Sequence, residues 1–529
     1  MKRRYAILAA LIILPLGVWL VAQTMQPTTN PSNYFPPGPA LYVETRDLSG
    51  LLGNWSASSE KRDWLVSDNY SVFSRSRLFL RLQEAQNEFT QAAGLAPDMD
   101  LVNSVAGAES GLAIYDIGKL EFLYITQLAS AKAIETALWK TRSTYDARNS
   151  AGQQYFVHSD PQSKRTAAFA ANNGWLLLAT REDLLAGALA LLAGQKNPPL
   201  SAENWFDAAV KASKQRGEIR IALNMPVLVR SPHFRSYWIQ GNVNQLKEYN
   251  AGIVDVFREA NQIREERVLL RRQPGPSMAA KESAAGPLDM IPANAGLYRA
   301  WAAPPAKDAA DLVYRKLLAP ASDAQPQSRY APQAADPDAT AGSEADLETR
   351  IDEPPLDLGD KKEDYNRLLA SLEKTPLEAM AEVQSSAVQI GGIFVTNPRA
   401  ILLLGTTAWN LSAVRAVTGK TSMRVNGRVL VLADSDAMLN SIRGGGQPVA
   451  SGTYVAVYRH AQELGNYTKL MTMLDYTRPA EGGRQREPQL YSQNVASLGR
   501  ALGRVESASI TVHDTGAAVP QTVIYRFRP

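Results

Sequence analysis

Two distant stretches of the sequence repeat one pattern of apolar and polar positions. They read NGWLLLATREDLLAGALALLAG at residues 173–194 and NGRVLVLADSDAMLNSIRG at residues 426–444. Asn-Gly favours a two-residue hairpin turn, because both residues tolerate positive φ, and the short apolar run that follows predicts a strand. In the first stretch we expect residues 165–172 as the incoming strand and residues 175–179 as the outgoing strand.

Each of these strands is followed by a helical pattern. Thr180 and Asp434 are predicted to cap the N-termini of the two helices, since side-chain oxygens of these residue types accept from free backbone N–H groups. Residues 184–192 are apolar on almost every side, which predicts a helix buried against the sheet. A run of this length is too short to cross a bilayer. The second helix is more amphipathic, with Asn440 and Arg443 facing out.

Further segments recur in the same order. The segments pair 40–43 with 296–298, 111–126 with 392–407, 217–224 with 452–459, and 267–272 with 523–528. The pair 111–126 and 392–407 each predict a strand, a tight turn and a second strand. The shared order predicts an internal duplication, with one domain at 40–285 and a related domain at 286–529.

The patterns predict an α+β fold, in which each domain is a mainly antiparallel sheet with packed helices. The two copies differ in two places. The second copy carries a Pro-, Ala- and acid-rich insertion at about 320–360, a composition typical of disorder. It also lacks the segment that contains QQYFVHSD, which we expect to contribute one strand and part of a helix to the first copy.

The N-terminus predicts a membrane anchor. Lys2, Arg3 and Arg4 precede an uncharged, largely apolar run at residues 5–22, long enough as a helix (about 27 Å) to cross a bilayer core. The basic flank predicts a cytoplasmic N-terminus and an exported remainder. A cleaved signal peptide or a buried helix are the alternatives. The Pro-rich residues 23–39 are expected to form an extended tether.

Composition narrows the classes of function. The chain has 529 residues, a formal net charge of +4 and no cysteine. Disulfides, thiolate nucleophiles, iron–sulfur clusters and cysteine-ligated zinc are therefore excluded. The weak basic excess is spread along the chain and does not form the basic patch that nucleic-acid binding needs.

The sequence resembles an uncharacterised family of bacterial membrane-anchored envelope proteins, catalogued as a domain of unknown function. The resemblance rests on the N-terminal anchor, the Pro-rich approach to ALYVE, the APDMDL stretch at residues 96–101, and WLLLATREDLLAGAL. It implies a duplicated α+β protein at the bacterial inner membrane, single-pass, with most of the chain in the periplasm. It implies no catalytic residue.

Motifs that resemble catalytic or metal sites fail on spacing. Gly419-Lys420-Thr421 lacks the glycine that a P-loop needs at 414. The four histidines are far apart and lack metal-site spacing, and Asp98 with Asp100 favours helix capping over calcium binding. We therefore predict no catalytic residue, no cofactor and no metal site.

One cluster predicts a binding patch. Basic and aromatic residues alternate after the strand GEIRIALN, a mixture that can bind sugars, peptides or anionic head groups. A loop whose aromatic side chains pack on the domain is the alternative. The candidate residues are Arg230, His233, Phe234, Arg235, Tyr237 and Trp238.

Together these features predict a membrane-tethered, extracytoplasmic scaffold or binding module that is not an enzyme. Its expected partners are the membrane, through residues 5–22, and another envelope protein; nucleic acid is not expected. An extracytoplasmic hydrolase with a non-local active site and a lipid or envelope-component chaperone are the alternative hypotheses.

Overall fold

The computed structural model describes most of the chain outside the N-terminus and two long segments. The described residues are 30–67, 70, 74, 77–232, 234, 246–275, 284–292, 295–318, 358, 361–386, 389–391, 394–410, 414–415, 418, 421–443, 452–460, 462–463 and 504–528. The predicted anchor at 1–22 and, apart from Leu358, the predicted insertion lie outside them. No helix within these ranges is both long and apolar enough to cross a membrane.

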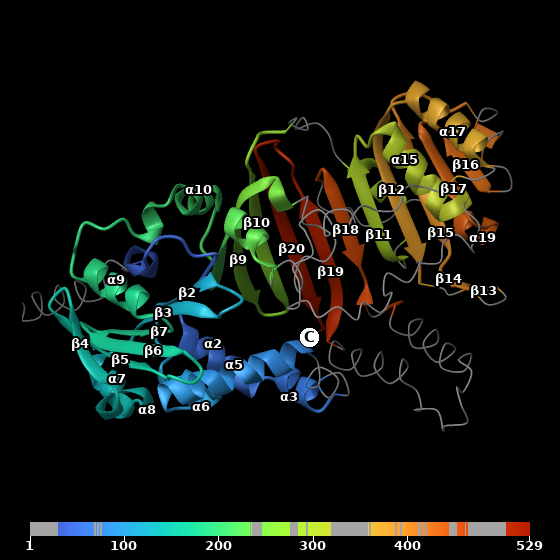
Figure 1. The fold of residues 1–529 in the computed structure, drawn as a ribbon. Coiled ribbons are helices and arrows are strands. Elements are labelled where there is room, and N and C mark those ends of the chain that lie inside the picture. Colours follow the sequence, from blue (N-terminus) through green and yellow to red (C-terminus); the bar gives the residue numbers. More distant parts are fainter. Residues whose placement is uncertain are drawn as a thin grey trace, which may run out of the picture. The chain divides into compact units, whose positions relative to one another are not determined.

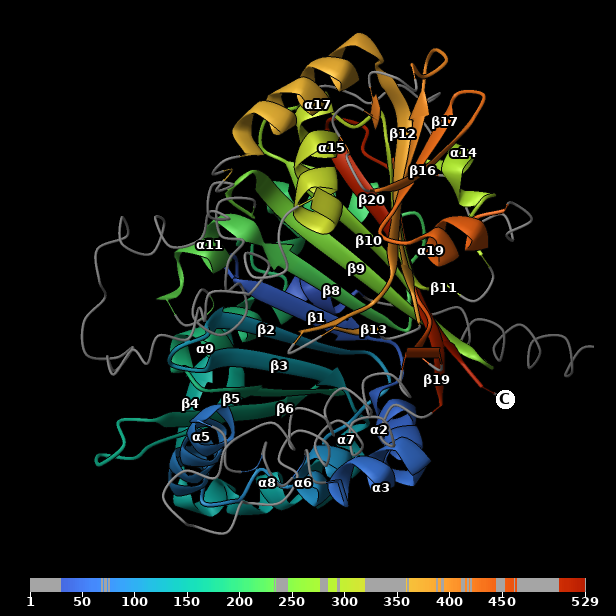
Figure 2. The same ribbon diagram turned by 90° about the vertical axis from the view of Figure 1, so that its right-hand side faces the viewer.

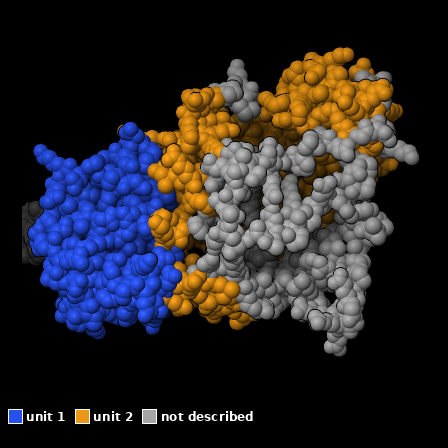
Figure 3. Space-filling view, viewed as in Figure 1, with its two compact units in different colours: residues 1–49, 88–115, 120–207 blue, residues 50–87, 116–119, 208–529 orange. Residues whose placement is uncertain are grey.

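The chain folds into two compact units (Figure 3). The first comprises residues 1–49, 88–115 and 120–207, and the second comprises residues 50–87, 116–119 and 208–529. Both are built from helices and antiparallel strands, so the α+β prediction is confirmed at this level (Figure 1). The boundary predicted at 285/286 separates two copies of a repeated sequence, whereas the units are defined by compactness. The repeat boundary therefore stays a prediction.

The sheet of the first unit has the order β1-β2-β3-β7-β6-β5-β4. Its strands are β1 (Leu41–Thr45), β2 (Ser110–Asp116), β3 (Glu121–Gln127), β4 (Asp146–Ser150), β5 (Gln153–Ser159), β6 (Thr166–Asn172) and β7 (Trp175–Ala179). The first unit also contains α6 (Met99–Ser104), α7 (Ser130–Glu135) and α8 (Ala137–Lys140), whereas α2 (Leu48–Ala57), α3 (Ser59–Leu65) and α5 (Arg77–Ala93) lie largely in residues 50–87 of the second unit. After β7 the chain forms α9 (Glu182–Leu192) and then α10 (Asn204–Ala212), within which the first unit ends.

The sheet of the second unit has the order β8-β9-β10-β20-β19-β18-β11-β12-β15-β17-β16. Its strands are β8 (Ile219–Asn224), β9 (Tyr249–Glu259), β10 (Gln262–Arg271), β11 (Ala295–Ala302), β12 (Leu377–Ser385), β15 (Arg399–Gly405), β16 (Ser422–Asn426), β17 (Val429–Ala433), β18 (Tyr454–Tyr458), β19 (Val505–Val512) and β20 (Ala518–Phe527). Its helices are α11 (Met225–Arg230), α14 (Ala285–Leu288), α15 (Ala306–Val313), η4 (Tyr314–Leu318), α17 (Lys362–Lys374) and α19 (Asp436–Ser441).

Strand order repeats between the two halves of the sequence. The order β1-β2-β3-β7-β6 corresponds to β11-β12-β15-β17-β16, and β8-β9-β10 corresponds to β18-β19-β20. The last strand of each series, β10 and β20, pair with each other. The matched segments at 40–43 and 296–298, 217–224 and 452–459, and 267–272 and 523–528 therefore occupy matching places in the pairing scheme.

Helices cover both faces of the sheet around β12, β15 and β17 (Figure 2). On one face, α15 and α17 pack over a core that includes Leu372, Ile401 and Leu432. On the other, α14 and α19 cover a core that includes Leu288 and Leu402. Side chains alternate between the two faces of a strand. Because both cores contain side chains of these strands, both of their faces are apolar.

The predicted buried helix of the first half is confirmed, but its predicted cap is wrong. Arg181 is the N-cap of α9 and makes no side-chain cap, while Thr180 Oγ1 accepts from the backbone N–H of Phe122. In the second half Ser435 caps α19, and Asp434 accepts from the backbone N–H of Arg399. Both predicted caps instead fasten the end of a strand to its neighbour.

The predicted hairpins are partly correct. In the first half Asn173 and Gly174 have φ of 49° and 79° and join β6 to β7, as the Asn-Gly pattern predicts. In the second half the turn lies one residue later, with Gly427 at φ 61°. This shift is allowed because glycine alone can supply the positive φ of a two-residue turn.

Two details of the predicted correspondence between the two copies are wrong. Residues 392–407 do not form one hairpin: β15 pairs with β12, while β14 (Phe394–Thr396) pairs with β13 (Gln389–Gly391) in a separate two-stranded sheet. The first half also gains two strands, β4 and β5, where the sequence predicted one.

Candidate functional site

The predicted patch at residues 230–238 is described only in part. Arg230 ends α11 with an exposed side chain, and Phe234 packs against Val229. The other four predicted residues lie outside the described part of the chain: His233, Arg235, Tyr237 and Trp238. This patch therefore stays a prediction.

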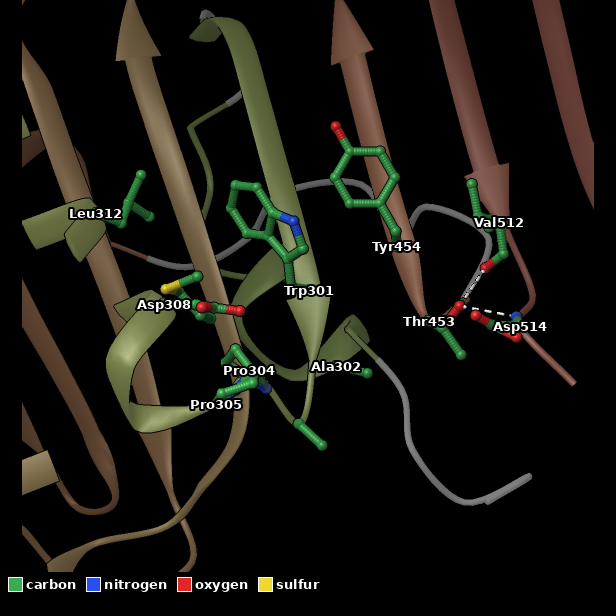
Figure 4. Close-up of a pocket in the computed structure, with 12 residues that line it drawn as sticks. Trp301, Ala302, Pro304, Pro305, Asp308, Leu312, Thr453, Tyr454, Val512 and Asp514 are labelled. Carbon is green, nitrogen blue, oxygen red and sulfur yellow. Dashed lines mark hydrogen bonds between the residues drawn. The ribbon is translucent and has the colours of Figure 1, made fainter. Parts of the chain in front are cut away.

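A pocket of about 420 Å³ lies within the second unit (Figure 4). It sits where β11 ends, β18 begins, and the chain turns from β11 into α15. The residues that line it are Trp301, Ala302, Ala303, Pro304, Pro305, Asp308, Leu312, Met380, Thr453, Tyr454, Val512 and Asp514.

Two aromatic side chains form one wall of this pocket. Trp301 of β11 and Tyr454 of β18 are direct partners in the antiparallel register. Their rings lie 5.5 Å apart between centroids, at an interplanar angle of 52°. Strand pairing thus brings together two residues that are distant in the sequence, and directly opposed aromatic pairs of this kind stabilise a sheet.

A charged cluster supports the indole from the same sheet face. Arg299 lies two residues before Trp301, so alternation places both side chains on one face. Its guanidinium lies 5.7 Å from the centre of the indole ring and forms an ion pair with Glu382, whose side chain is buried. Lys316 lies 3.9 Å from the same carboxylate. The indole therefore lies beside an arginine whose charge is neutralised by Glu382.

The opposite wall comes from the turn after β11 and from α15. Pro304 and Pro305 end the strand, since proline has no N–H for the ladder. Ala303 has a φ of +40°, an uncommon value for a residue with a Cβ. Asp308 and Leu312 follow on α15, and their spacing of four residues places both on one side of the helix.

The far end of the pocket is polar and internally satisfied. Thr453 Oγ1 donates to the carbonyl of Val512 at 2.9 Å and accepts from the N–H of Asp514 at 3.0 Å (Figure 4). Asp514 also pairs with Arg271 at 2.5 Å. The charge of Asp514 is therefore neutralised within the protein.

Three polar groups that line the pocket have no hydrogen-bond or ion-pair partner among the described residues. They are the Asp308 carboxylate, the Trp301 indole N–H and the Tyr454 hydroxyl. Burial raises the pKa of Tyr454 above its usual range; nearby Arg299 lowers it and Glu382 raises it. The phenol therefore stays protonated at neutral pH and can donate a hydrogen bond.

The two halves of the sequence differ at this pocket. Trp301 corresponds to Thr45 in the pair LYVET and LYRAW, and Tyr454 corresponds to Ile219 in the pair GEIRIALN and GTYVAVYR. By contrast, Tyr42 and Tyr298 occupy corresponding positions and are both buried. The repeated fold therefore requires the buried tyrosine but does not require the pocket aromatics.

The titratable residues that line the pocket are Asp308, Tyr454 and Asp514. An apolar cleft with a few directed polar groups is typical of a binding site. Among the described residues, no group of three or more His, Cys, Asp or Glu side chains is arranged to hold a metal ion. The arrangement can bind a molecule of mixed apolar and polar character.

The repeated segment 452–459 contains Tyr454, and the repeated segment 296–298 ends three residues before Trp301, but both were predicted only as strands. The available signal was the difference between the copies, an aromatic residue where the other copy has Thr45 or Ile219. No sequence pattern linked Trp301 to Tyr454, because only the β11–β18 pairing makes them neighbours.

Comparison with known proteins adds little. No protein family matches this chain, and no curated protein is similar to it in sequence. Among solved structures, crystal form I of TP0453 is 10% identical, with a TM-score of 0.25 over 47% of this chain and 81% of the other. Crystal form IV is 8% identical, with a TM-score of 0.26 over 46% and 81%. Similarities this weak assign this chain neither a family nor a function.

Proposed function

We propose that this protein is a membrane-tethered, extracytoplasmic binding module of the bacterial envelope, without catalytic activity of its own. Its anchor would be residues 5–22, its folded part would descend from an internal duplication, and its binding site would be the pocket around Trp301. The single observation that carries the proposed site is the difference between the copies at Trp301 and Tyr454.

The repeated fold forms without this half-buried aromatic pair, although the pair also stabilises the sheet locally. Thr45 and Ile219 stand at the corresponding positions of the other copy, which forms the corresponding strands. Partly exposed Trp and Tyr side chains beside a cavity provide large contact area with a polar tip, and such residues dominate the energy of binding sites. Selection for a ligand accounts for them better than selection for the fold.

In-cell photo-cross-linking tests this proposal. A photoreactive phenylalanine derivative replaces Pro305, an exposed residue at the pocket, in the full-length chain. The matched control carries the same derivative at Ala437, an exposed residue of α19 on the other face of the sheet. We expect a discrete adduct from position 305 and none from position 437. Equal adducts at both positions, or none at 305, contradict the proposed site.

The tether has its own test. Cells that express the full-length protein are subjected to osmotic shock without detergent. A retained anchor at residues 5–22 keeps the protein with the membranes, whereas release into the shock fluid contradicts the anchor and leaves the pocket proposal standing.

A further inference from the structure

The unpartnered groups in the pocket indicate the chemistry of its ligand. Asp308 carries an exposed negative charge at the pocket, and neither a hydrogen bond nor an ion pair joins it to another described residue. The nearby charges are already paired: Asp514 with Arg271, Glu382 with Arg299, and Asp311 with Lys307 on the same helix. Asp308 is thus the carboxylate of this pocket that is open to a ligand's charge.

The position of Asp308 on α15 also has a structural explanation. It lies in the first turn of α15, where a negative charge stabilises the helix N-terminus. That explanation accounts for the acid but not for the aromatic wall, nor for an indole N–H and a phenol hydroxyl that have no partner in the described part of the chain. A ligand with apolar, accepting and cationic parts would make use of all four features together.

From these features we infer that the pocket binds an extended, proline-containing peptide segment of a partner protein through a lysine or arginine side chain. The inference rests on the proposed function, because it names the ligand class of the same pocket. The ammonium or guanidinium group would lie at Asp308, and the aliphatic stem would lie along Trp301 and Tyr454. Long basic side chains bury their stems on apolar surface in this way while the charged end meets a carboxylate.

An extended peptide also satisfies the neutral donors. A polyproline II segment has no internal hydrogen bonds, so its carbonyls are free to accept. The indole N–H of Trp301 and the hydroxyl of Tyr454 can donate to such carbonyls, and grooves lined by aromatic residues are a recurring docking site for segments of this kind. A simple lipid chain offers no acceptor to these donors and no cation to Asp308.

The test uses three capped peptides, Ala-Pro-Xaa-Pro-Ala, in which Xaa is lysine, norleucine or glutamate. Binding to the purified full-length protein in detergent is measured by calorimetry. We expect the lysine peptide to bind about fivefold more tightly than the norleucine peptide, the size of an exposed charge–charge contact. The glutamate peptide should bind most weakly.

Two variants make the result specific. Asp308→Asn should bring the lysine peptide to the affinity of the norleucine peptide while leaving the norleucine affinity unchanged. Glu363→Gln removes an equal charge from an exposed site on α17 outside the pocket and should preserve the lysine preference.

The outcomes separate the two proposals. If the lysine peptide has no advantage, or if Asp308→Asn preserves it, the inferred ligand class is wrong. Preference for a glucosamine oligosaccharide over all three peptides also overturns it, since the cation then belongs to a glycan. In either case a discrete photo-adduct from position 305 keeps the binding module, whereas its absence removes both proposals.

Discussion

Thr522 donates a hydrogen bond to Glu266 across the β10–β20 pair, at a distance of 2.8 Å and a separation of 256 positions. The matched segments 267–272 and 523–528, which directly follow these two residues, have the same separation. Glu266 and Thr522 are therefore equivalent residues of the two copies that face each other. When two copies of one strand pair in antiparallel orientation, a local twofold axis passes between the equivalent residues that face each other. Strands β10 and β20, the last strands of the two copies, are therefore related by such an axis between Glu266 and Thr522.

Removal of this contact should weaken the second unit modestly. Thr522→Val is expected to lower the free energy of unfolding by about 1 kcal/mol, the typical net value of one hydrogen bond. Urea denaturation measures the change, and Thr407→Val, at an exposed residue outside the strands, is the control. If Thr522→Val lowers the free energy of unfolding no more than Thr407→Val does, the pairing of β10 with β20 does not depend on this hydrogen bond.

A second prediction concerns the ion pair between β8 and β9. Arg220 and Asp255 are joined at 2.8 Å with side chains that are 7% and 1% exposed, and Ser213 also donates to the carboxylate. Asp255→Asn leaves a buried guanidinium without its counter-charge and should cost about 3–5 kcal/mol in unfolding free energy.

The matched control for Asp255 lies on β9 and on the residue just before β8. Arg258 and Glu218 form an ion pair at 2.9 Å, but both side chains are well exposed. Glu218→Gln should cost at most about 1 kcal/mol because solvent screens the exposed pair. If Asp255→Asn and Glu218→Gln lower the free energy of unfolding equally, burial does not determine how much each ion pair contributes to stability.

The third prediction concerns Glu463, which is buried and whose carboxylate oxygens have no hydrogen-bond partner among the described residues. Burial raises the pKa of its carboxyl above the usual range, and the Asn397 side chain acts in the opposite direction. Folding then favours the protonated form. The resulting stability is present at low pH and is lost as the pH rises through the unfolded-state pKa, about 4.3, towards the folded pKa.

Glu463→Gln should therefore stabilise the protein at pH 7 and give little gain at pH 4. Thermal unfolding at both values measures this, with the exposed Glu373→Gln as control. The stability that His460 contributes has the opposite pH dependence, because burial and, secondarily, Arg528 lower its pKa. Both variants retain His460, so its contribution does not affect the comparison. A gain that is equal at the two pH values would show that ionisation of Glu463 is not involved.

Sequence predicted features that depend on the local backbone better than features that depend on tertiary pairing. The Asn173-Gly174 turn followed from the φ values that the two residues tolerate. The roles of Thr180 and Asp434 were mistaken because a polar residue between a strand and a helix looks like a cap. Their true partners, the N–H groups of Phe122 and Arg399, lie on neighbouring strands.

The candidate site could not be predicted for the same reason. Trp301 and Tyr454 belong to separate repeated segments, and neither segment carries a motif. The pairing of β11 with β18 places them together, and α15 then adds Asp308. Periodicity identified each strand, but it contains no information about which strands become neighbours.

The most direct test of the account is the photo-cross-link from position 305 in cells that also carry Trp301→Ala. Loss of a central aromatic contact typically costs a binding site more than 1.4 kcal/mol, so the adduct should fall about tenfold or more. Trp55→Ala, at an exposed tryptophan of α2, should leave it unchanged. An adduct that persists at full yield in Trp301→Ala, with the protein folded, would contradict the claim that this pocket is the binding site.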